Sequence, residues 1–205
     1  IATWLKSNPI GYAQWFYQRA IINQTRFLSL REAIKPVPEY QKEKYPLQRI
    51  VQILKRHRDI MFQGDEDKPI SIIITTLAAK AYHGENIVEG LYNIVHTMDE
   101  YIENRNGIYW VSNPVNNKEN FADKWEEKPI KRKNFFYWKN RLQKDIDTIL
   151  SASGMYAIQD SLTQPFGREL ITETFSARAQ ELKSLRDANK LKMMTTGVLS
   201  TTASI

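Results

Sequence analysis

Three basic side chains in one stretch of the sequence have the chemistry to bind an anion. Lys55, His57 and Arg58 fall within residues 46–62, where apolar residues recur with the three-and-four spacing of an amphipathic helix. A helical projection places Arg58 near the centre of the apolar stripe, with Lys55 and His57 on its flanks. A guanidinium on a core-facing stripe needs an anionic partner, because an unpaired charge is costly to bury.

Two interpretations of these cations are open. In the first, Arg58 pairs with a structural carboxylate, while Lys55 packs its aliphatic stem on the core and keeps its ammonium in water. In the second, Lys55 and Arg58 face a bound polyphosphate. A choice between these two interpretations requires the rest of the sequence.

Helical periodicity extends over most of the chain. We expect helices over residues 12–31, 46–62, 84–105, 134–152 and 155–188, the last broken near Pro165, with a loop through residue 12 before the first. Residues 69–82 give opposite signals, since their β-branched side chains favour a strand while their length, initial proline and alanine-rich end favour a helix. The pattern predicts a mainly α-helical fold, with residues 191–205 as a flexible tail.

Two connecting segments contain polar clusters. Asp65 and Asp67 form an Asp-x-Asp pair, which can hold Mg²⁺ beside phosphates. Acidic residues next to glycine and proline are more typical of a solvated loop that caps the following helix, so we expect no metal site there. Residues 107–129, rich in asparagine, proline and aromatic residues, are predicted to form a surface loop or a functional lid.

Composition limits the class of protein. The 205 residues are 42% hydrophobic, which is enough to bury a core, and a formal charge of +6 modestly favours anionic partners. No apolar run is long enough to cross a bilayer, and the absence of cysteine fits a reducing cytoplasm, where we expect the protein to be located. The first residue is Ile1 rather than methionine, so we expect the chain to be part of a longer protein.

The sequence contains none of the common catalytic motifs: no cysteine nucleophile, H-E-x-x-H, G-x-S-x-G, P-loop or Rossmann glycine set. Its three histidines lie in separate segments and predict no zinc site. Four segments nevertheless resemble the C-terminal helical half of bacterial cyclic-oligonucleotide synthases, the CD-NTase family. In order, they are SNPIGYAQWF (7–16), RIVQILKRHRDIMF (49–62), KPISIIITTLAAKAY (68–82) and NPVNNKENFADKW (113–125).

This resemblance implies both a fold and a function. Residues 1–190 would be the helical C-terminal lobe of a nucleotidyltransferase, without its α/β catalytic core, and residues 69–82 would be helical. The intact enzyme would join nucleoside triphosphates into a cyclic di- or trinucleotide second messenger for anti-phage (CBASS) signalling. The family's lysine and serine for the donor triphosphate fall on Lys55 and Ser71, with Arg58 and Thr75 as weaker candidates. Residues 113–125 would pack near the nucleotide cleft.

The chain departs from the family in one respect. The family's Gly-Ser motif and the carboxylates that hold two Mg²⁺ ions precede the first of these segments, and this chain has no counterpart. Asp65 and Asp67 do not replace them, because they follow the long helix, where the family has a variable loop. We therefore expect Mg²⁺ to bind outside this chain, no catalytic residue within it, and no activity from the chain alone.

Two alternative functions are open. In the first, residues 193–205 are held by, or conjugated to targets by, a ubiquitin-transfer-like protein. In the second, the chain is the RNA-binding helical domain of a poly(A)-polymerase relative, as its basic charge and residues 131–133 suggest. Nucleoside triphosphates are the partners we expect, rather than nucleic acid or a membrane.

Overall fold

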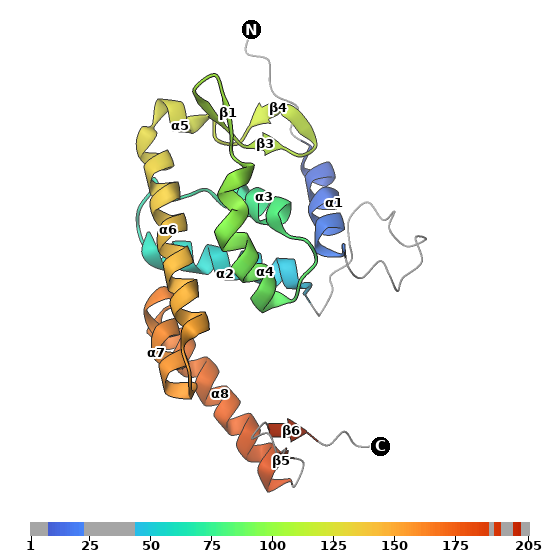
Figure 1. Ribbon diagram of the computed structural model, residues 1–205, viewed down its shortest axis with the longest axis vertical. Coiled ribbons are helices and arrows are strands. Elements are labelled where there is room, and N and C mark those ends of the chain that lie inside the picture. Colours follow the sequence, from blue (N-terminus) through green and yellow to red (C-terminus); the bar gives the residue numbers. More distant parts are fainter. Residues whose placement is uncertain (1–7, 23–43, 189–190, 194–198, 202–205) are drawn as a thin grey trace, which may run out of the picture. The chain divides into compact units, whose positions relative to one another are not determined.

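The computed structural model describes residues 8–22, 44–188, 191–193 and 199–201, which belong to two compact units divided at residue 150 (Figure 1). The helices of the first unit are α1 (Pro9–Ala20), α2 (Pro46–Met61), α3 (Ser71–Ala81), α4 (Ile87–Thr97), the 3₁₀ helix η2 (Met98–Tyr101), α5 (Lys124–Glu127) and α6 (Pro129–Ser151). Its antiparallel strand pairs are β1 (Glu103–Arg105) with β2 (Ile108–Trp110), and β3 (Ser112–Asn113) with β4 (Asn116–Asn120). The prediction of a mainly α-helical fold is confirmed.

Helix α3 lies at the centre of the first unit, where it packs against α1, α2, α4 and η2 (Figure 1). Every residue from Ile73 to Ala79 is buried. A helix that is apolar on all sides is stable only when neighbours surround it, and burial of this kind overrides the strand preference of isoleucine and threonine. The helical form implied by the resemblance is therefore confirmed.

Helix α1 begins earlier than the sequence analysis predicted. The Asn8 side chain accepts a 2.8 Å hydrogen bond from the backbone N–H of Gly11, and Pro9 occupies the first helical turn. Asparagine as an N-cap followed by proline is a helix start, so the prediction of a loop through residue 12 is wrong.

Two side chains of α1 hold α3 in place. The Tyr12 hydroxyl lies 2.9 Å from Oγ1 of the fully buried Thr76, and burial raises the pKa of Tyr12 to about 12 although this hydrogen bond lowers it. Arg19 donates hydrogen bonds to the carbonyl oxygens of Ala79, at 2.7 Å, and Tyr82. These carbonyls lie at the C-terminal end of α3, where helical partners run out, so α1 completes its hydrogen bonding.

The predicted helix over residues 84–105 is too long at its C-terminal end. Helix α4 ends at Thr97, η2 continues it, and residues 103–105 form β1. Strands β1 and β2 meet at Asn106 and Gly107, whose φ angles of 55° and 90° suit a two-residue hairpin turn. The Asn-Gly pair was the sequence signal for this hairpin.

Residues 107–129, predicted to be a surface loop or lid, contain the regular elements β2, β3, β4 and α5. Oδ1 of Asn120 accepts hydrogen bonds from the backbone N–H groups of Val111, at 2.8 Å, and Ala122, at 2.9 Å. Nδ2 of the buried Asn113 donates to Glu119 at 2.7 Å. These asparagines satisfy polar groups of a short, irregular hairpin, which explains their abundance in the segment.

The second unit contains α7 (Met155–Phe166) and α8 (Arg168–Asp187), which pack together. Gly167 separates them with a φ of +95°, which confirms the predicted break. Strand β5 (Leu191–Met193) pairs antiparallel with β6 (Leu199–Thr201). The rest of the tail, and the predicted helical residues 23–31, lie outside the described residues, so the flexibility of residues 191–205 stays a prediction. Within the described ranges, no helix is long and apolar enough to cross a membrane.

Candidate triphosphate-binding site

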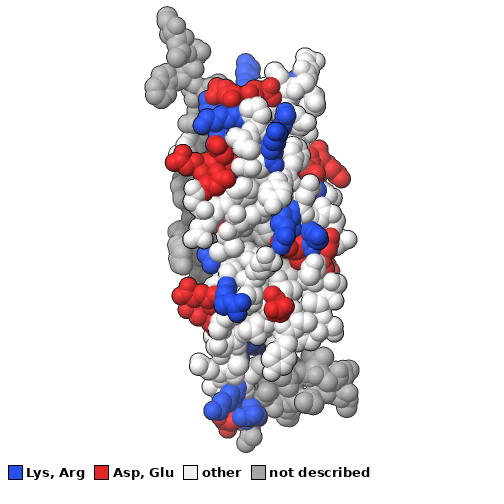
Figure 2. Space-filling view, turned by 90° about the vertical axis from the view of Figure 1, so that its left-hand side faces the viewer, with Lys and Arg blue, Asp and Glu red and all other residues white. Residues whose placement is uncertain are grey.

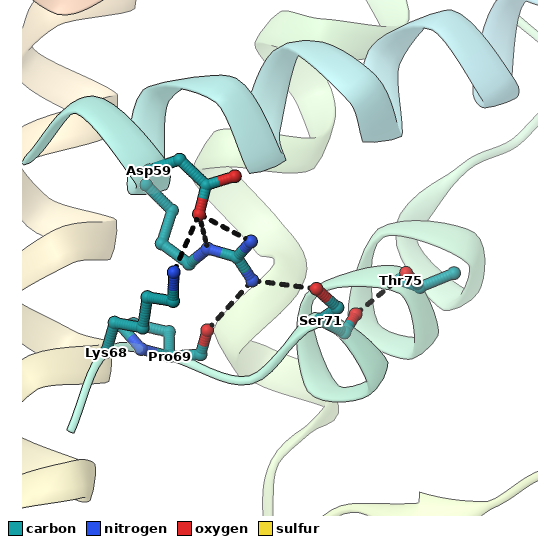
Figure 3. A network of polar contacts seen from close by, with 6 residues as sticks. Asp59, Lys68, Pro69, Ser71 and Thr75 are labelled. Atoms are coloured by element: carbon teal, nitrogen blue, oxygen red, sulfur yellow. Dashed lines mark hydrogen bonds and ion pairs between the residues drawn. The ribbon is translucent and has the colours of Figure 1, made fainter. Parts of the chain in front are cut away.

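Ser71 and Thr75 lie at the start of α3, next to the end of α2, as Figure 3 shows. Lys55 and Arg58 belong to the last two turns of α2, Ser71 is the first residue of α3, and Thr75 lies one turn further on. Nη1 of Arg58 donates a 2.8 Å hydrogen bond to Oγ of Ser71. With the hydrogen bond from Thr75 to the Ser71 carbonyl oxygen, the structure joins three of the four predicted residues by direct contact.

Arg58 is held by protein atoms on all sides of its guanidinium. It is 6% exposed, and its Nε and Nη2 donate to Oδ1 of Asp59 at 3.0 and 2.8 Å. Its Nη1 donates to the Pro69 carbonyl oxygen at 3.0 Å as well as to Ser71. The interpretation of Arg58 as a structural ion-pair partner is confirmed, and a direct contact of Arg58 with phosphate stays a prediction.

Asp59 and Lys68 extend this network, as Figure 3 shows, and neither was anticipated from the sequence. Nζ of Lys68 lies 3.3 Å from the same Asp59 oxygen. Burial raises the pKa of the Asp59 carboxyl, but hydrogen bonds and charges from Arg58 and Lys68 outweigh it and hold this pKa below its ordinary value. Helical periodicity does not reveal the ion pair between Arg58 and Asp59, because adjacent residues of a helix do not normally face each other.

Lys55 is a half-buried cation on α2. Its ammonium makes no hydrogen bond or ion pair with any residue that the structure describes. Burial lowers its pKa, as does the positive charge of Arg58, while the charge of Asp59 acts in the opposite direction. A partly desolvated ammonium of this kind gains most from an anion supplied by a ligand.

The N-terminal end of α3 offers further groups to an anion. Ser71 is exposed, the preceding residue Ile70 provides no side-chain cap, and the first turn contains no acidic residue. Free backbone N–H groups and the positive end of the helix dipole favour an anion at such a position. The prediction that the acidic loop caps α3 is therefore wrong.

Thr75 is placed to support the helix. Its side chain is buried, and Oγ1 donates a 2.8 Å hydrogen bond to the Ser71 carbonyl oxygen. This bond closes within α3 and commits the hydroxyl hydrogen to the backbone. A direct contact of Thr75 with nucleotide stays a prediction.

The acidic loop is attached to the start of α6. Asp67 forms a 2.9 Å ion pair with Lys131, and the hydrogen bond from Lys131 lowers the pKa of the Asp67 carboxyl. The guanidinium of the neighbouring Arg132 lies 4.7 Å from the centre of the Tyr109 ring. Among the residues that can be described, no three histidine, cysteine, aspartate or glutamate side chains form a group able to hold a metal ion.

His57 faces α6 rather than the α2–α3 junction. Its Nε2 lies 3.0 Å from Oδ2 of Asp145, which also accepts a 2.9 Å hydrogen bond from Nε of Arg141. The imidazole is 2% exposed, and burial lowers its pKa although its hydrogen bond and ion pair with Asp145 act in the opposite direction. His57 therefore fastens α2 to α6.

Comparisons with known proteins agree with this fold. Over 86% of its length the chain superposes on a solved structure of the CD-NTase CdnG from Bradyrhizobium diazoefficiens in complex with GTP, with a TM-score of 0.62 and 19% sequence identity. The match covers 57% of that protein, and at this level of identity it shows the fold. No family model matches the sequence.

A curated protein is similar in sequence as well. The chain is 36% identical over 202 residues to the c-di-GMP synthase of Roseivirga ehrenbergii, a match that covers 96% of this chain and 53% of that protein. The chain thus spans about half the length of the curated relative. These comparisons confirm the predicted resemblance: the chain is similar in sequence to a bacterial c-di-GMP synthase and in fold to a CD-NTase.

Proposed function

We propose that this chain is the helical, C-terminal part of a bacterial nucleotidyltransferase that makes a cyclic di- or trinucleotide second messenger for anti-phage signalling. The relative's name makes c-di-GMP the first product to test, and the GTP complex of CdnG makes GTP the first substrate. Within this enzyme, Lys55 and Ser71 bind the triphosphate of the donor nucleotide.

One observation supports this role more than any other. The ammonium of Lys55 has no ion pair among the described residues, and burial together with the charge of Arg58 lowers its pKa. The exposed Ser71 hydroxyl, at a helix start without a side-chain cap, contacts Arg58 directly. Phosphoryl transfer depends on positioning and on neutralisation of charge more than on covalent help from the protein. Because Arg58 and Lys68 engage the carboxylate of Asp59, a triphosphate is the anion that we propose for Lys55.

The proposed reaction has two equivalent steps. A ribose hydroxyl of one nucleotide attacks the α-phosphorus of the other, a phosphodiester forms, and the bond to the β-phosphate breaks with release of pyrophosphate. Repetition closes the ring, so two GTP yield c-di-GMP and two pyrophosphates. Lys55 and Ser71 would hold the phosphate tail of the donor while this occurs.

The described residues of this chain do not supply a magnesium site. The carboxylate nearest to Ser71 in the contact network, Asp59, is engaged by Arg58 and Lys68, and Asp67 is paired with Lys131. We propose that the family's carboxylates lie outside this chain and hold Mg²⁺ there. On this proposal the chain alone, mixed with GTP and Mg²⁺, forms no cyclic product.

The test is product formation by the intact enzyme. Lys55→Ala should reduce the rate of cyclic dinucleotide synthesis at limiting GTP by about tenfold or more, the value of a charge-assisted hydrogen bond. Arg56→Ala removes an exposed cation from the same helix and should leave synthesis near wild type. Unchanged synthesis by the Lys55 variant, followed by thin-layer chromatography, would contradict the assignment.

No specific observation favours the two alternatives. In residues 131–133, Lys131 is paired with Asp67 and Arg132 stacks on Tyr109, so two of the three cations have partners. On the described part of the face shown in Figure 2, basic and acidic side chains are interspersed, without the continuous basic stripe typical of RNA binding. The ubiquitin-transfer-like partner concerns a tail that is mostly outside the described residues, and it stays a prediction.

A further inference from the structure

We propose that Arg58 is a positioning residue that fixes the direction of the Ser71 hydroxyl hydrogen. This inference rests on the proposed function, in which Ser71 contacts the triphosphate. Arginine only donates hydrogen bonds, so the 2.8 Å contact from Nη1 makes the Ser71 oxygen the acceptor. The hydroxyl hydrogen then points away from the guanidinium, and within the described chain it has no acceptor of its own.

Arg58 is itself fixed before any ligand arrives. Two hydrogen bonds to Asp59 and one to the Pro69 carbonyl oxygen hold the planar guanidinium at all three of its nitrogen atoms. The side chain is 6% exposed, so it has little freedom to turn. A fixed planar fork loses little further freedom when it directs a neighbouring hydroxyl.

The direction of the hydroxyl determines which ligand atoms suit the site. Phosphate oxygens accept hydrogen bonds, so the Ser71 hydroxyl, whose oxygen accepts from Arg58, would donate its hydrogen to them. A cationic donor also polarises the hydroxyl, which strengthens the bond that it donates onward. The Ser71 hydroxyl thus offers a hydrogen-bond donor to acceptor atoms of the ligand. Arg58 acts on the ligand through Ser71 rather than by direct contact.

The test is a double-mutant cycle on this chain, with inorganic tripolyphosphate as the probe and affinity measured by isothermal titration calorimetry. Ser71→Ala should weaken binding by about tenfold. Arg58→Met should weaken binding by a similar factor in the wild-type background and have little further effect in the Ser71→Ala background, because its route to the ligand is then absent. Arg56→Met, on the exposed side of α2, calibrates the effect of removing one charge.

Arg58→Lys provides a second variant if Arg58→Met does not fold, as judged by circular dichroism. It keeps the charge but lacks the planar fork that joins Asp59 to Ser71, so it should show the same dependence on Ser71. Equal losses in both backgrounds, or wild-type affinity in the folded Arg58 variants, would overturn the inference and leave the proposed site standing. Wild-type affinity in Ser71→Ala would instead overturn the site assignment and, with it, this inference.

Discussion

Arg58, in the last turn of α2, donates a 2.8 Å hydrogen bond to the hydroxyl of Ser71, the first residue of α3. Residues 62–70 connect the two helices, and this hydrogen bond holds the start of α3 next to the end of α2. Lys55 lies one turn earlier on α2. On the proposed function, the Lys55 ammonium, the Ser71 hydroxyl and the N-terminal end of α3 bind the same ligand.

Affinity for tripolyphosphate should fall as pH rises through the alkaline range. Burial and the charge of Arg58 lower the pKa of Lys55, so the free protein begins to lose this proton below the ordinary lysine value of about 10.4. An anion binds the protonated form better, and affinity therefore decreases as pH rises through the lowered pKa. Titrations at several pH values measure this slope.

Lys55→Arg is the matched control for this dependence. Arginine stays charged throughout the alkaline range, so the affinity of the Lys55→Arg variant for tripolyphosphate should change much less with pH. The same slope in both proteins would show that the ammonium of Lys55 is not in the site.

Acidification should destabilise the first unit through His57. Burial lowers the pKa of this imidazole in the folded protein, so the unfolded chain binds its proton more readily. Its contribution to stability is present above the unfolded pKa of about 6.5 and is lost as pH falls from there toward the folded pKa. Thermal melts between about pH 7.5 and 5 should show the loss, and His57→Gln, which cannot titrate, should show a shallower decline. Parallel curves would rule out this role.

Gly90 marks a close approach of α4 to the core. A Cβ added there would lie 2.9 Å from the Ile50 side chain and 3.1 Å from the Tyr82 ring, both of which are buried. Overpacking should exceed the gain in helix propensity, so Gly90→Ala should lower the free energy of unfolding by about 1 kcal/mol. Val88→Ala, at a position 57% exposed on the same helix, should have little effect in urea denaturation. A more stable Gly90 variant would show that the contact relaxes.

Residues 7–16, the first of the four segments that resemble the CD-NTase family, should stabilise the fold rather than contact the ligand. Tyr12→Phe removes the 2.9 Å contact with the buried Thr76 hydroxyl and should cost about 1 to 2 kcal/mol of unfolding free energy. Affinity for tripolyphosphate should stay within about twofold of wild type, since Tyr12 does not contact the α2–α3 junction in any described hydrogen bond. A large loss of affinity in a folded Tyr12→Phe variant would place this segment in the ligand site.

Much of the helical fold could be predicted from periodicity, because amphipathic stripes such as that of residues 46–61 depend only on nearby residues. Residues 69–82 could not be assigned this way, since α3 is surrounded by other helices and its packing, rather than its β-branched composition, decides its form. The start at Asn8 and the hairpin at Asn106 had sequence signals, in an N-cap before proline and an Asn-Gly turn, that helical periodicity concealed.

The site was predictable in part. Lys55 and Ser71 were assigned by resemblance, and nothing in the periodicity of α2 or α3 singles out Ser71. The partners of Arg58 could not be foreseen, because Asp59 is its immediate neighbour and Pro69 contributes only a carbonyl oxygen. Backbone acceptors are available at every residue, so sequence alone does not indicate which one a buried guanidinium meets.

We propose that a triphosphate binds between Lys55 and the start of α3. Chemical-shift mapping of the isotope-labelled chain during titration with tripolyphosphate tests it most directly. We expect the largest backbone amide shifts at residues 71–73 and next to Lys55, and a weaker response in the Ser71→Ala variant. Shifts centred on residues 131–133 or on α8, with residues 71–73 unmoved, would contradict it.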